Sequence, residues 1–265
     1  MLKIIHISDL HLSAPLGRFS ALFDKRLIGF LNGAVFRKHA YDPENIRKAI
    51  QMIPAEKPDL IVLTGDATTC SQPEEFRLAA ELLRPLKDTG IPILFTPGNH
   101  DCYVKAKECT EARMEFQKYL TGSAELPAKF ETPECTFLIT HSAVPTNPLL
   151  SCGCVSPETV SFLEQECSNK SKPIVLLSHF PVLKQEKGIA GKRRRLNGAE
   201  PIREMIRDGR IDLVLCGHIH KPYEILEENG HGEICAGSLA KAGIYRVITC
   251  DQNRFHFENR FPGAN

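Results

Sequence analysis

The sequence predicts an α/β fold, and two observations support this prediction. Short apolar runs of strand length alternate along the chain with segments in which apolar residues recur at helical spacing. Five of these runs lead into a polar cluster rich in His, Asp and Gly, and they occupy residues 2–8, 60–64, 91–96, 173–178 and 211–216. Because ligand sites in open α/β sheets collect at the carboxyl ends of strands, the five ends favour one shared site.

An insertion, residues 12–45, follows the first strand and leads to a helix at about 43–53. Within the insertion, apolar residues recur at helical spacing beside Lys25 and Arg26, namely Leu22, Phe23, Leu27, Ile28, Phe30 and Leu31. A basic cluster with an aromatic residue, Phe36-Arg37-Lys38-His39, comes next. We predict an amphipathic helix that covers one edge of the sheet. The alternative is a cap at the mouth of the site, or a patch for peripheral contact with a membrane surface.

The later helices are predicted from their end signals. Glu74 and Glu75 lie in the first turn of a helix over residues 73–88, where acidic side chains complement the helix dipole. Ser156 is a good N-cap for a helix that begins at Pro157. These two helices and two others are expected at about 73–88, 105–120, 157–167 and 201–207.

The remaining segments are predicted as strands. Residues 130–141 have the pattern of a strand pair. The last part of the chain alternates apolar and polar residues, which is typical of antiparallel strands, over residues 223–227, 233–236, 244–250 and 254–259. We expect one domain over residues 1–265, which is long enough to bury a large core.

The five strand ends carry side chains that bind transition metals. Two are Asp, one is Asn and four are His: Asp9, His11, Asp66, Asn99, His179, His218 and His220. With His100, these ends hold five of the ten histidines of the chain. Carboxylate and imidazole together suit Mn, Fe, Zn, Co or Ni. One carboxylate can bridge two cations, and Asp66 is the candidate because it follows a central strand.

In sequence order these clusters resemble the five motifs of the calcineurin-like metallophosphoesterase superfamily. The motifs are Asp9-x-His11, Gly65-Asp66, Gly98-Asn99-His100-Asp101, His179 and Gly217-His218-x-His220, with no departure at a ligand position. The chain is most similar to small bacterial phosphodiesterase-like members. Its second motif continues Ala67-Thr68-Thr69-Cys70, so it lacks the Arg of Ser/Thr protein phosphatases and the Asn or Asp of some relatives.

The resemblance implies a fold and a metal centre. The fold would be a four-layer αββα sandwich of two mixed β-sheets flanked by helices, with the metal site at the C-terminal strand ends. Asp66 would bridge two metals, one bound also by Asp9, His11 and His220, the other by Asn99, His179 and His218. A hydroxide held between metals roughly 3.5–4 Å apart would attack phosphorus in line.

The resemblance also implies roles for two neighbours of the ligands. His100 would stabilise or protonate the leaving oxygen, and Asp101 would orient His100. Tyr103, close behind this motif, is expected to face the cleft and contact substrate.

The most basic run of the chain, from Lys187 to Arg195, follows His179 and is predicted as a glycine-containing loop. Its Arg193, Arg194 and Arg195 would bind a second phosphate of the substrate, since guanidinium forms bidentate pairs with phosphate. A solvated surface loop without contact to substrate is an equal alternative.

Composition restricts the class of protein. The chain has 265 residues and a formal net charge of +1, so no global basic field favours nucleic acid. No run approaches the roughly 18–20 apolar residues of a membrane helix. Because the N-terminus passes directly into a strand that leads to Asp9, we expect no cleaved signal peptide and a cytoplasmic location.

The ten cysteines show no pair of Cys-x-x-Cys motifs, so most are expected to be buried free thiols. Cys152-Gly153-Cys154 is the one local candidate for redox or thiolate chemistry.

The sequence therefore predicts a binuclear-metal phosphohydrolase, foremost a phosphodiesterase that acts on a small phosphodiester or a nucleotide-type substrate. Its cofactors would be two divalent or trivalent transition metals, Mn²⁺ and/or Fe, with Zn, Co or Ni as other choices. Three alternatives stay open: a nucleotide-sugar pyrophosphatase of the lipid A pathway, where His100 would often be Arg; a DNA or RNA nuclease, which would need an extended basic groove; and a phosphomonoesterase. The oligomeric state is left open.

Overall fold

The computed structural model describes residues 1–17, 21, 23–29, 41–184, 188–228 and 230–261. One mixed sheet has five strands in the order β13-β12-β1-β2-β3. In it β1, β2 and β3 are parallel, while β12 is antiparallel to both β1 and β13. The bounds are β1 (Leu2–Ile7), β2 (Leu60–Leu63), β3 (Ile93–Phe95), β12 (Tyr245–Asp251) and β13 (Arg254–Arg260).

The second mixed sheet has six strands in the order β10-β11-β9-β7-β5-β4. Its four inner strands are parallel, and the edge strands β4 and β10 are antiparallel to their neighbours. The bounds are β4 (Ala128–Glu131), β5 (Thr136–Ile139), β7 (Ile174–Leu177), β9 (Leu213–Cys216), β10 (Tyr223–Leu226) and β11 (Gly232–Cys235). A separate pair joins β6 (Gly153–Cys154) and β8 (Leu196–Asn197).

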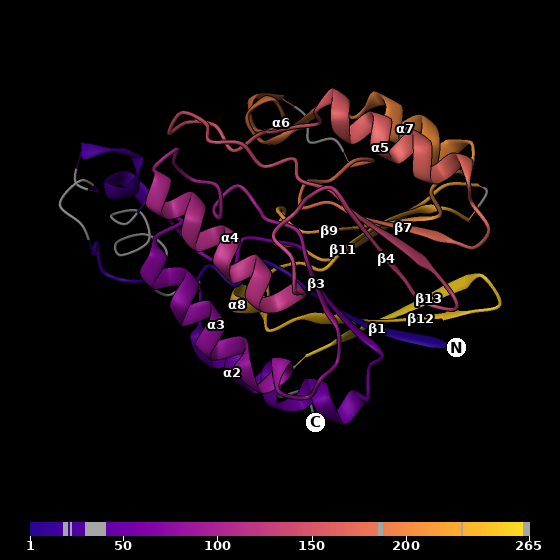
Figure 1. The fold of residues 1–265 in the computed structure, drawn as a ribbon, viewed down its shortest axis with the longest axis horizontal. Helices are drawn as coiled ribbons and strands as arrows, with labels where there is room; N and C mark the ends of the chain where they lie inside the picture. Colours follow the sequence, from indigo (N-terminus) through magenta and orange to yellow (C-terminus); the bar gives the residue numbers. More distant parts are fainter. Residues whose placement is uncertain (18–20, 22, 30–40, 185–187, 229, 262–265) are drawn as a thin grey trace.

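Helices cover the outer faces of both sheets, as Figure 1 shows. Against the first sheet lie α2 (Pro43–Met52), the 3₁₀ turn η2 (Ile53–Glu56), α3 (Pro73–Lys87) and α4 (Lys107–Thr121). Against the second lie α5 (Pro157–Ser168) and α7 (Glu200–Arg207). Two further short helices are α6 (Gly188–Arg194) and α8 (Leu239–Ala242). This arrangement confirms the predicted four-layer αββα sandwich.

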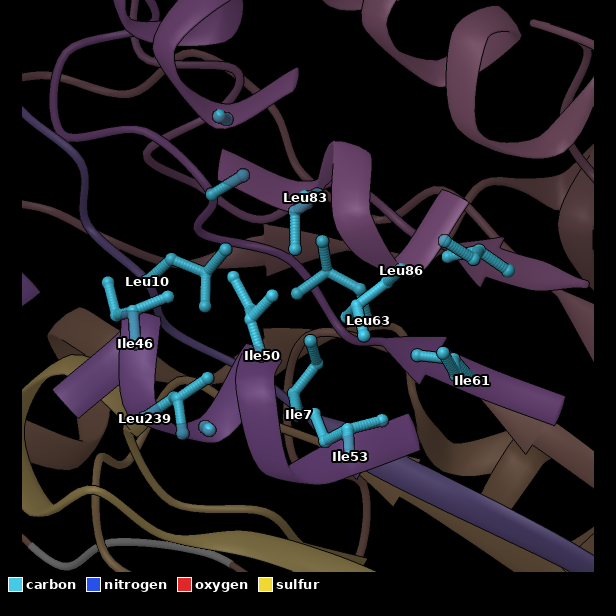
Figure 2. Packing of buried hydrophobic residues seen from close by; sticks show 14 of the residues in the cluster. Ile7, Leu10, Ile46, Ile50, Ile53, Ile61, Leu63, Leu83, Leu86 and Leu239 are labelled. Atoms are coloured by element: carbon cyan, nitrogen blue, oxygen red, sulfur yellow. The ribbon is translucent and has the colours of Figure 1, made fainter. Parts of the chain in front are cut away.

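Alternation along the strands builds the layers, since successive side chains of a strand point to opposite faces. In β2, Ile61 and Leu63 pack under the helices, whereas Leu60 and Val62 pack between the sheets. In β7, Val175 and Leu177 join that same inter-sheet cluster. Figure 2 shows the outer cluster, which contains Ile46 and Ile50 of α2 together with Ile7 and Leu63.

The predicted elements appear within a few residues of their expected ends. The Asp42 side chain accepts a hydrogen bond from the Glu44 amide at the start of α2, and Ser156 caps α5 through the Thr159 amide. Two expectations were wrong. The strand β11 pairs with β9 in parallel, and the basic run at 188–194 forms α6 although Gly188 and Gly191 lower its helix propensity.

The insertion is helical at residues 25–29, and Phe36–His39 lies outside the described residues. Its buried face differs from the expected apolar one. Arg26 is only 2% exposed, while Phe23 and Ile28 are 77% and 53% exposed. Arg26 can be buried because its guanidinium pairs with Asp24 and Glu108. Among the described residues, no helix is both long and apolar enough to cross a bilayer.

Candidate metal centre

The carboxyl ends of the parallel strands bring all seven predicted ligands together. Two groups of His and Asp side chains form, and within each group the candidate ligand atoms lie within 4.8 Å of one another. The first is Asp9, His11, Asp66 and His220, and the second is Asp66, His179 and His218. Asn99 joins the second group, because its Oδ1 lies 3.2 Å from His179 Nε2 and 2.9 Å from His218 Nδ1.

Asp66 lies between the two groups. Its Oδ2 is 3.4 Å from Nε2 of His179 and 3.7 Å from Nε2 of His11. The other oxygen, Oδ1, accepts a hydrogen bond of 2.8 Å from the His100 amide, which fixes the carboxylate plane. The position is that of a carboxylate shared between two sites.

Backbone carbonyls set the orientation of the second group. His179 Nδ1 lies 2.7 Å from the Thr64 carbonyl oxygen. Because a carbonyl only accepts, Nδ1 carries a hydrogen, and Nε2 is the nitrogen that faces Asp66 and Asn99. His218 donates in the same way from Nε2 to the Arg194 carbonyl at 3.1 Å, so its Nδ1 faces the site. Such outer hydrogen bonds are how metal-binding imidazoles are usually oriented.

The first group fits a transition metal. The Nε2 atoms of His11 and His220 face each other at 3.0 Å, and Nε2 of His220 is 3.1 Å from Oδ1 of Asp9. That oxygen is buried yet makes no hydrogen bond among the described residues. Buried polar atoms normally have a partner, and a cation held by these nitrogen and oxygen donors would provide one. The donor set is that of a borderline transition metal.

The electrostatics favour the metal-binding forms of Asp66 and His218, but they favour the protonated form of His179. Burial opposes the charge on Asp66, but His179 and His100 outweigh it and hold the pKa of the carboxyl well below its usual range. Burial and the positive His179 ring lower the pKa of His218 far below its usual value. Burial opposes the charge on His179, but the carboxylates, Asp66 foremost, raise its pKa to about 9. Ionised carboxylates and a neutral imidazole are the forms that bind metals.

The backbone at the centre is strained. Five of the candidate ligands have positive φ: Asp9 (56°), His11 (47°), Asp66 (52°), His218 (68°) and His220 (59°). For residues with a Cβ this region costs of order 1–3 kcal/mol each. Such strain persists where the surrounding structure imposes it, and it concentrates at functional sites.

Two motif glycines are required by close packing. A Cβ on Gly98 would collide with the carboxylate and the amide nitrogen of Asp66. A Cβ on Gly217 would meet the Ser8 hydroxyl and lie 2.6 Å from Oδ2 of Asp9. These glycines therefore let the backbone approach the two buried carboxylates.

The surroundings of His100 differ from the expected ones. Nδ1 of His100 donates to the Thr69 carbonyl at 2.6 Å, so this bond orients the ring. The carboxylate of Asp101 instead accepts from the Gly98 amide at 2.9 Å and from the Thr68 amide at 3.0 Å. Burial and the nearby Asp66 charge raise the pKa of Asp101 to about 6. Asp101 thus ties two ligand-bearing loops together.

Tyr103 packs against the ring of His100 and is largely buried, rather than exposed to the cleft. The two rings stack at 5.4 Å with an interplanar angle of 11°, and Tyr103 is only 8% exposed. Lys25 also lies over the Tyr103 ring, with Nζ 4.0 Å from the ring centroid. This burial favours a supporting role over the predicted contact with substrate.

Tyr41, which no sequence pattern indicated, also borders the first group. Its hydroxyl lies 3.3 Å from Nδ1 of His220, and its ring centroid is 4.7 Å from that of His11. Tyr41 stands in the insertion beside no motif, so no sequence signal marks it.

The three predicted arginines have separate positions. Arg194 donates from Nη2 to the His218 carbonyl at 2.9 Å. Arg195 donates from Nε to Oδ1 of Asn197 at 2.7 Å. Arg194 and Arg195 line a cavity beside the centre, and Arg193 is not among its lining residues.

All ten cysteines are free thiols, and eight are buried as predicted. Cys152 is half-buried and Cys154 is exposed.

Comparisons with known proteins identify the family. The sequence pattern described as calcineurin-like phosphoesterase matches residues 2–222. A probable cyclic nucleotide phosphodiesterase from Pseudoalteromonas sp. (strain SM9913) is 26% identical over 84% of this chain and 73% of its own length. A glycerophosphodiester phosphodiesterase from Enterobacter lignolyticus is 25% identical over 62% of this chain, and the match spans 57% of that relative.

Solved structures share the fold. A dimetal phosphatase from Danio rerio superposes with a TM-score of 0.70 at 12% identity, over 98% of this chain and 96% of that one. A purple acid phosphatase from yellow lupin seeds gives 0.69 at 13% identity, over 99% of this chain and 52% of that one. Because the family pattern covers most of the residues and spans all five predicted motifs, the chain belongs to the calcineurin-like phosphoesterases, a family of enzymes that hydrolyse phosphoesters.

Proposed function

We propose that the protein is a metal-dependent phosphodiesterase that hydrolyses a small phosphodiester or a nucleotide-type substrate. The observation that carries this proposal is the position of Asp66, whose carboxylate belongs to both groups of candidate ligands. One group would hold the first metal through Asp9, His11, Asp66 and His220. The other would hold the second metal through Asp66, Asn99, His179 and His218.

The donor set favours Mn²⁺ or Fe, with Zn, Co or Ni as alternatives. Two such cations, when bound, supply Lewis acidity toward the phosphoryl oxygens and lower the pKa of a water toward about 7. The chain holds the ligands in place beforehand, because Thr64 and Arg194 fix the rings of His179 and His218. Of the seven ligand side chains, that of His220 is 17% exposed, whereas Asp9 and His11 are fully buried. Substrate would enter on the side of His220.

We assign the proton for the leaving oxygen to His100. Its Nδ1 hydrogen is committed to the Thr69 carbonyl, so a transferred proton would come from Nε2. The ring is partly exposed, and its centroid lies 4.8 Å from that of His11. His100 therefore borders the first ligand group at the accessible side of the centre.

The preference for diesters is supported by the relatives, which are named as cyclic nucleotide and glycerophosphodiester phosphodiesterases. The test compares bis-p-nitrophenyl phosphate with p-nitrophenyl phosphate on Mn-loaded protein, since both release the same leaving group. We expect kcat/KM at least about tenfold higher for the diester, which is about 1.4 kcal/mol of transition-state discrimination. An equal or faster monoester reaction would make the protein a phosphomonoesterase. Asp66→Asn, purified in parallel, controls for contaminating hydrolases.

We also propose that residues 1–265 form one domain in the cytoplasm. A single hydrophobic cluster contains residues from both sheets, including Leu60 and Val175, which supports one cooperative unit. Ten free cysteines suit a reducing compartment. We expect the protein to unfold in a single transition that two spectroscopic probes report identically. We also expect the protein to be recovered in the cytosolic fraction of cells. Two separate transitions, or recovery outside the cytosol, would contradict them.

A further inference from the structure

A cavity of about 450 Å³ lies beside the candidate metal centre. Its walls come from α6, β8, the start of α7 and the loops that follow β7 and β9. We propose that this cavity binds a second phosphoryl group of the substrate, remote from the one that is hydrolysed. The proposal rests on the proposed function, and it narrows the substrate class to diesters that carry a further phosphate.

The charge of the lining supports an anionic ligand. Five lining side chains are cationic and one is a carboxylate, Glu200. That carboxylate is already engaged, because its Oε1 lies 2.8 Å from Nη1 of Arg203. The chain as a whole is almost neutral at +1, so the cationic excess is local. The cationic residues are Lys184, Lys192, Arg194, Arg195 and Arg203.

The other lining residues favour phosphate over a nucleobase. None of the described lining residues is aromatic, so the cavity has no ring on which a base could stack. Besides the cations they are mostly small or polar, with Gly188, Gly191, Gly198 and Asn197 among them. Guanidinium groups match the geometry of phosphate oxygens. A phosphoryl group is therefore the chemistry that the walls fit.

The cavity is joined directly to the metal centre. Arg194 donates from Nη2 to the His218 carbonyl at 2.9 Å, and His218 Nε2 donates back to the Arg194 carbonyl at 3.1 Å. Ile219, between the ligands His218 and His220, lines the cavity. Pro181, two residues after the ligand His179, lines it as well. A substrate whose reacting phosphorus lies at the metals can thus place a second group here.

Two of the cations are suited to a test. Arg194 is tied to the ligand loop, and Arg203 donates from Nε to the Val182 carbonyl, so replacing either would disturb the centre. Lys192 and Arg195 are exposed. The side chain of Arg195 makes one hydrogen bond among the described residues, from Nε to Asn197, so both of its Nη groups can reach a phosphate.

The experiment uses two substrates that share the reacting group and the leaving group. They are the 5′-(p-nitrophenyl phosphate) of thymidine and the same ester with an added 3′-phosphate. On Mn-loaded wild-type protein we expect the 3′-phosphate to raise kcat/KM by at least about tenfold, as charge-assisted contacts of ordinary strength would give. The ratio of interest is kcat/KM for the 3′-phosphorylated ester divided by kcat/KM for the plain ester. In the double variant Lys192→Ala/Arg195→Ala this ratio should fall to about one, because KM rises for the phosphorylated ester alone.

Arg193→Ala is the matched control, because it removes an exposed cation of α6 that does not line the cavity. It should keep the wild-type ratio. A ratio near one in wild type, or the same loss in Arg193→Ala as in the double variant, would overturn the proposal while leaving the phosphodiesterase function intact.

A binding measurement separates failure of the cavity from failure of the proposed function. Inorganic pyrophosphate is titrated calorimetrically into metal-free protein. We expect Kd to rise about tenfold or more in the double variant and to stay unchanged in Arg193→Ala. If neither ester is hydrolysed but this difference in Kd appears, the phosphodiesterase function is wrong and the anion site stands. If Kd is the same in all three proteins, the anion site is wrong.

Discussion

The candidate metal centre and the cationic cavity beside it are neighbours built in opposite ways. The centre takes its seven side chains from five strand ends, and nearly all are buried. The cavity takes Lys192, Arg194 and Arg195 from one short basic run, and Lys192 and Arg195 are exposed. The difference follows from their tasks: metal ligands need fixed positions, which rigid strands provide, whereas recognition of a remote anion tolerates mobile surface side chains.

The backbone shows the same contrast. Five candidate ligands have positive φ, and none of the five cavity cations does. Strain at the ligands is held by the packed sheets, so a change there should affect metal and catalysis together. Changes at the exposed cavity cations Lys192 and Arg195 should affect only the substrates that reach the cavity.

The largest effect is expected for Asp66→Asn, since Asp66 is shared by both ligand groups. Loss of one bridging charge should lower kcat/KM by roughly 10³-fold or more, because bound cations supply several kcal/mol of transition-state stabilisation. Steady-state rates on bis-p-nitrophenyl phosphate measure the loss. Asp88→Asn, an exposed carboxylate at the end of α3, should be unaffected. If the kcat/KM of Asp66→Asn is within tenfold of the wild-type value, the proposal that Asp66 bridges two metals is wrong.

Variants of the adjacent residues Asn99 and His100 should distinguish a loss of metal binding from a loss of proton transfer. His100→Ala should keep both metals and lose kcat by roughly 10²–10⁴-fold, with a smaller loss for p-nitrophenyl than for alkyl leaving groups. Asn99→Ala should lose activity that excess Mn²⁺ partly restores. Rates on both ester classes, with metal content by elemental analysis, check this. Equal losses on both classes for His100→Ala would exclude the acid role.

A smaller effect is expected at Gly98, where a Cβ would collide with Asp66. Gly98→Ala should weaken metal binding by roughly 10–100-fold, the range seen when supporting contacts of ligands are lost. Gly122 is the control, since its φ is +86° but a Cβ there meets nothing within 4 Å. Gly122→Ala should lower only the free energy of unfolding, by about 1 kcal/mol. Metal titrations that do not distinguish the two variants would contradict the close-packing argument.

The last prediction concerns a buried carboxylate outside both regions. Burial raises the pKa of Glu75 to about 7, although the Cys70 and Gln72 amides donate to it. The folded protein therefore binds this proton more tightly than the unfolded chain does. The associated stability is complete below about pH 4.5 and is lost as the pH rises through about 7.

Glu75→Gln keeps an acceptor but removes this titration. From pH 5 to pH 8 the variant should gain stability relative to wild type, by up to about 3 kcal/mol. Urea unfolding of both proteins at each pH measures the difference, and effects common to both cancel. A difference that does not change with pH would contradict the raised pKa.

Most of the candidate metal centre could be predicted from sequence, for a physical reason. Its side chains are rare types that directly follow apolar strands, and the carboxyl ends of strands in both packed sheets bring Asp9, Asp66 and His218 together. The role of Asp101 could not be predicted, because its hydrogen bonds to Thr68 and Gly98 depend on how two loops meet.

The cavity could be predicted only in part. The sequence indicated Arg194 and Arg195 but also Arg193, which does not line it, and it did not indicate Lys184 or Arg203. Lys184 comes from the loop after β7 and Arg203 from α7, and their meeting at the cavity leaves no periodic signal in the sequence. Burial of Arg26 was missed for a similar reason, since Glu108 is distant in sequence.

We propose that these strand ends hold two metals, and the number of metals bound per chain can be measured. Purified protein is stripped with chelator, reconstituted with Mn²⁺, freed of excess metal and analysed for elements and protein concentration. We expect two metals per chain, measured on protein that circular dichroism shows to be folded. One metal per chain, or none, in folded protein with every ligand intact would contradict it.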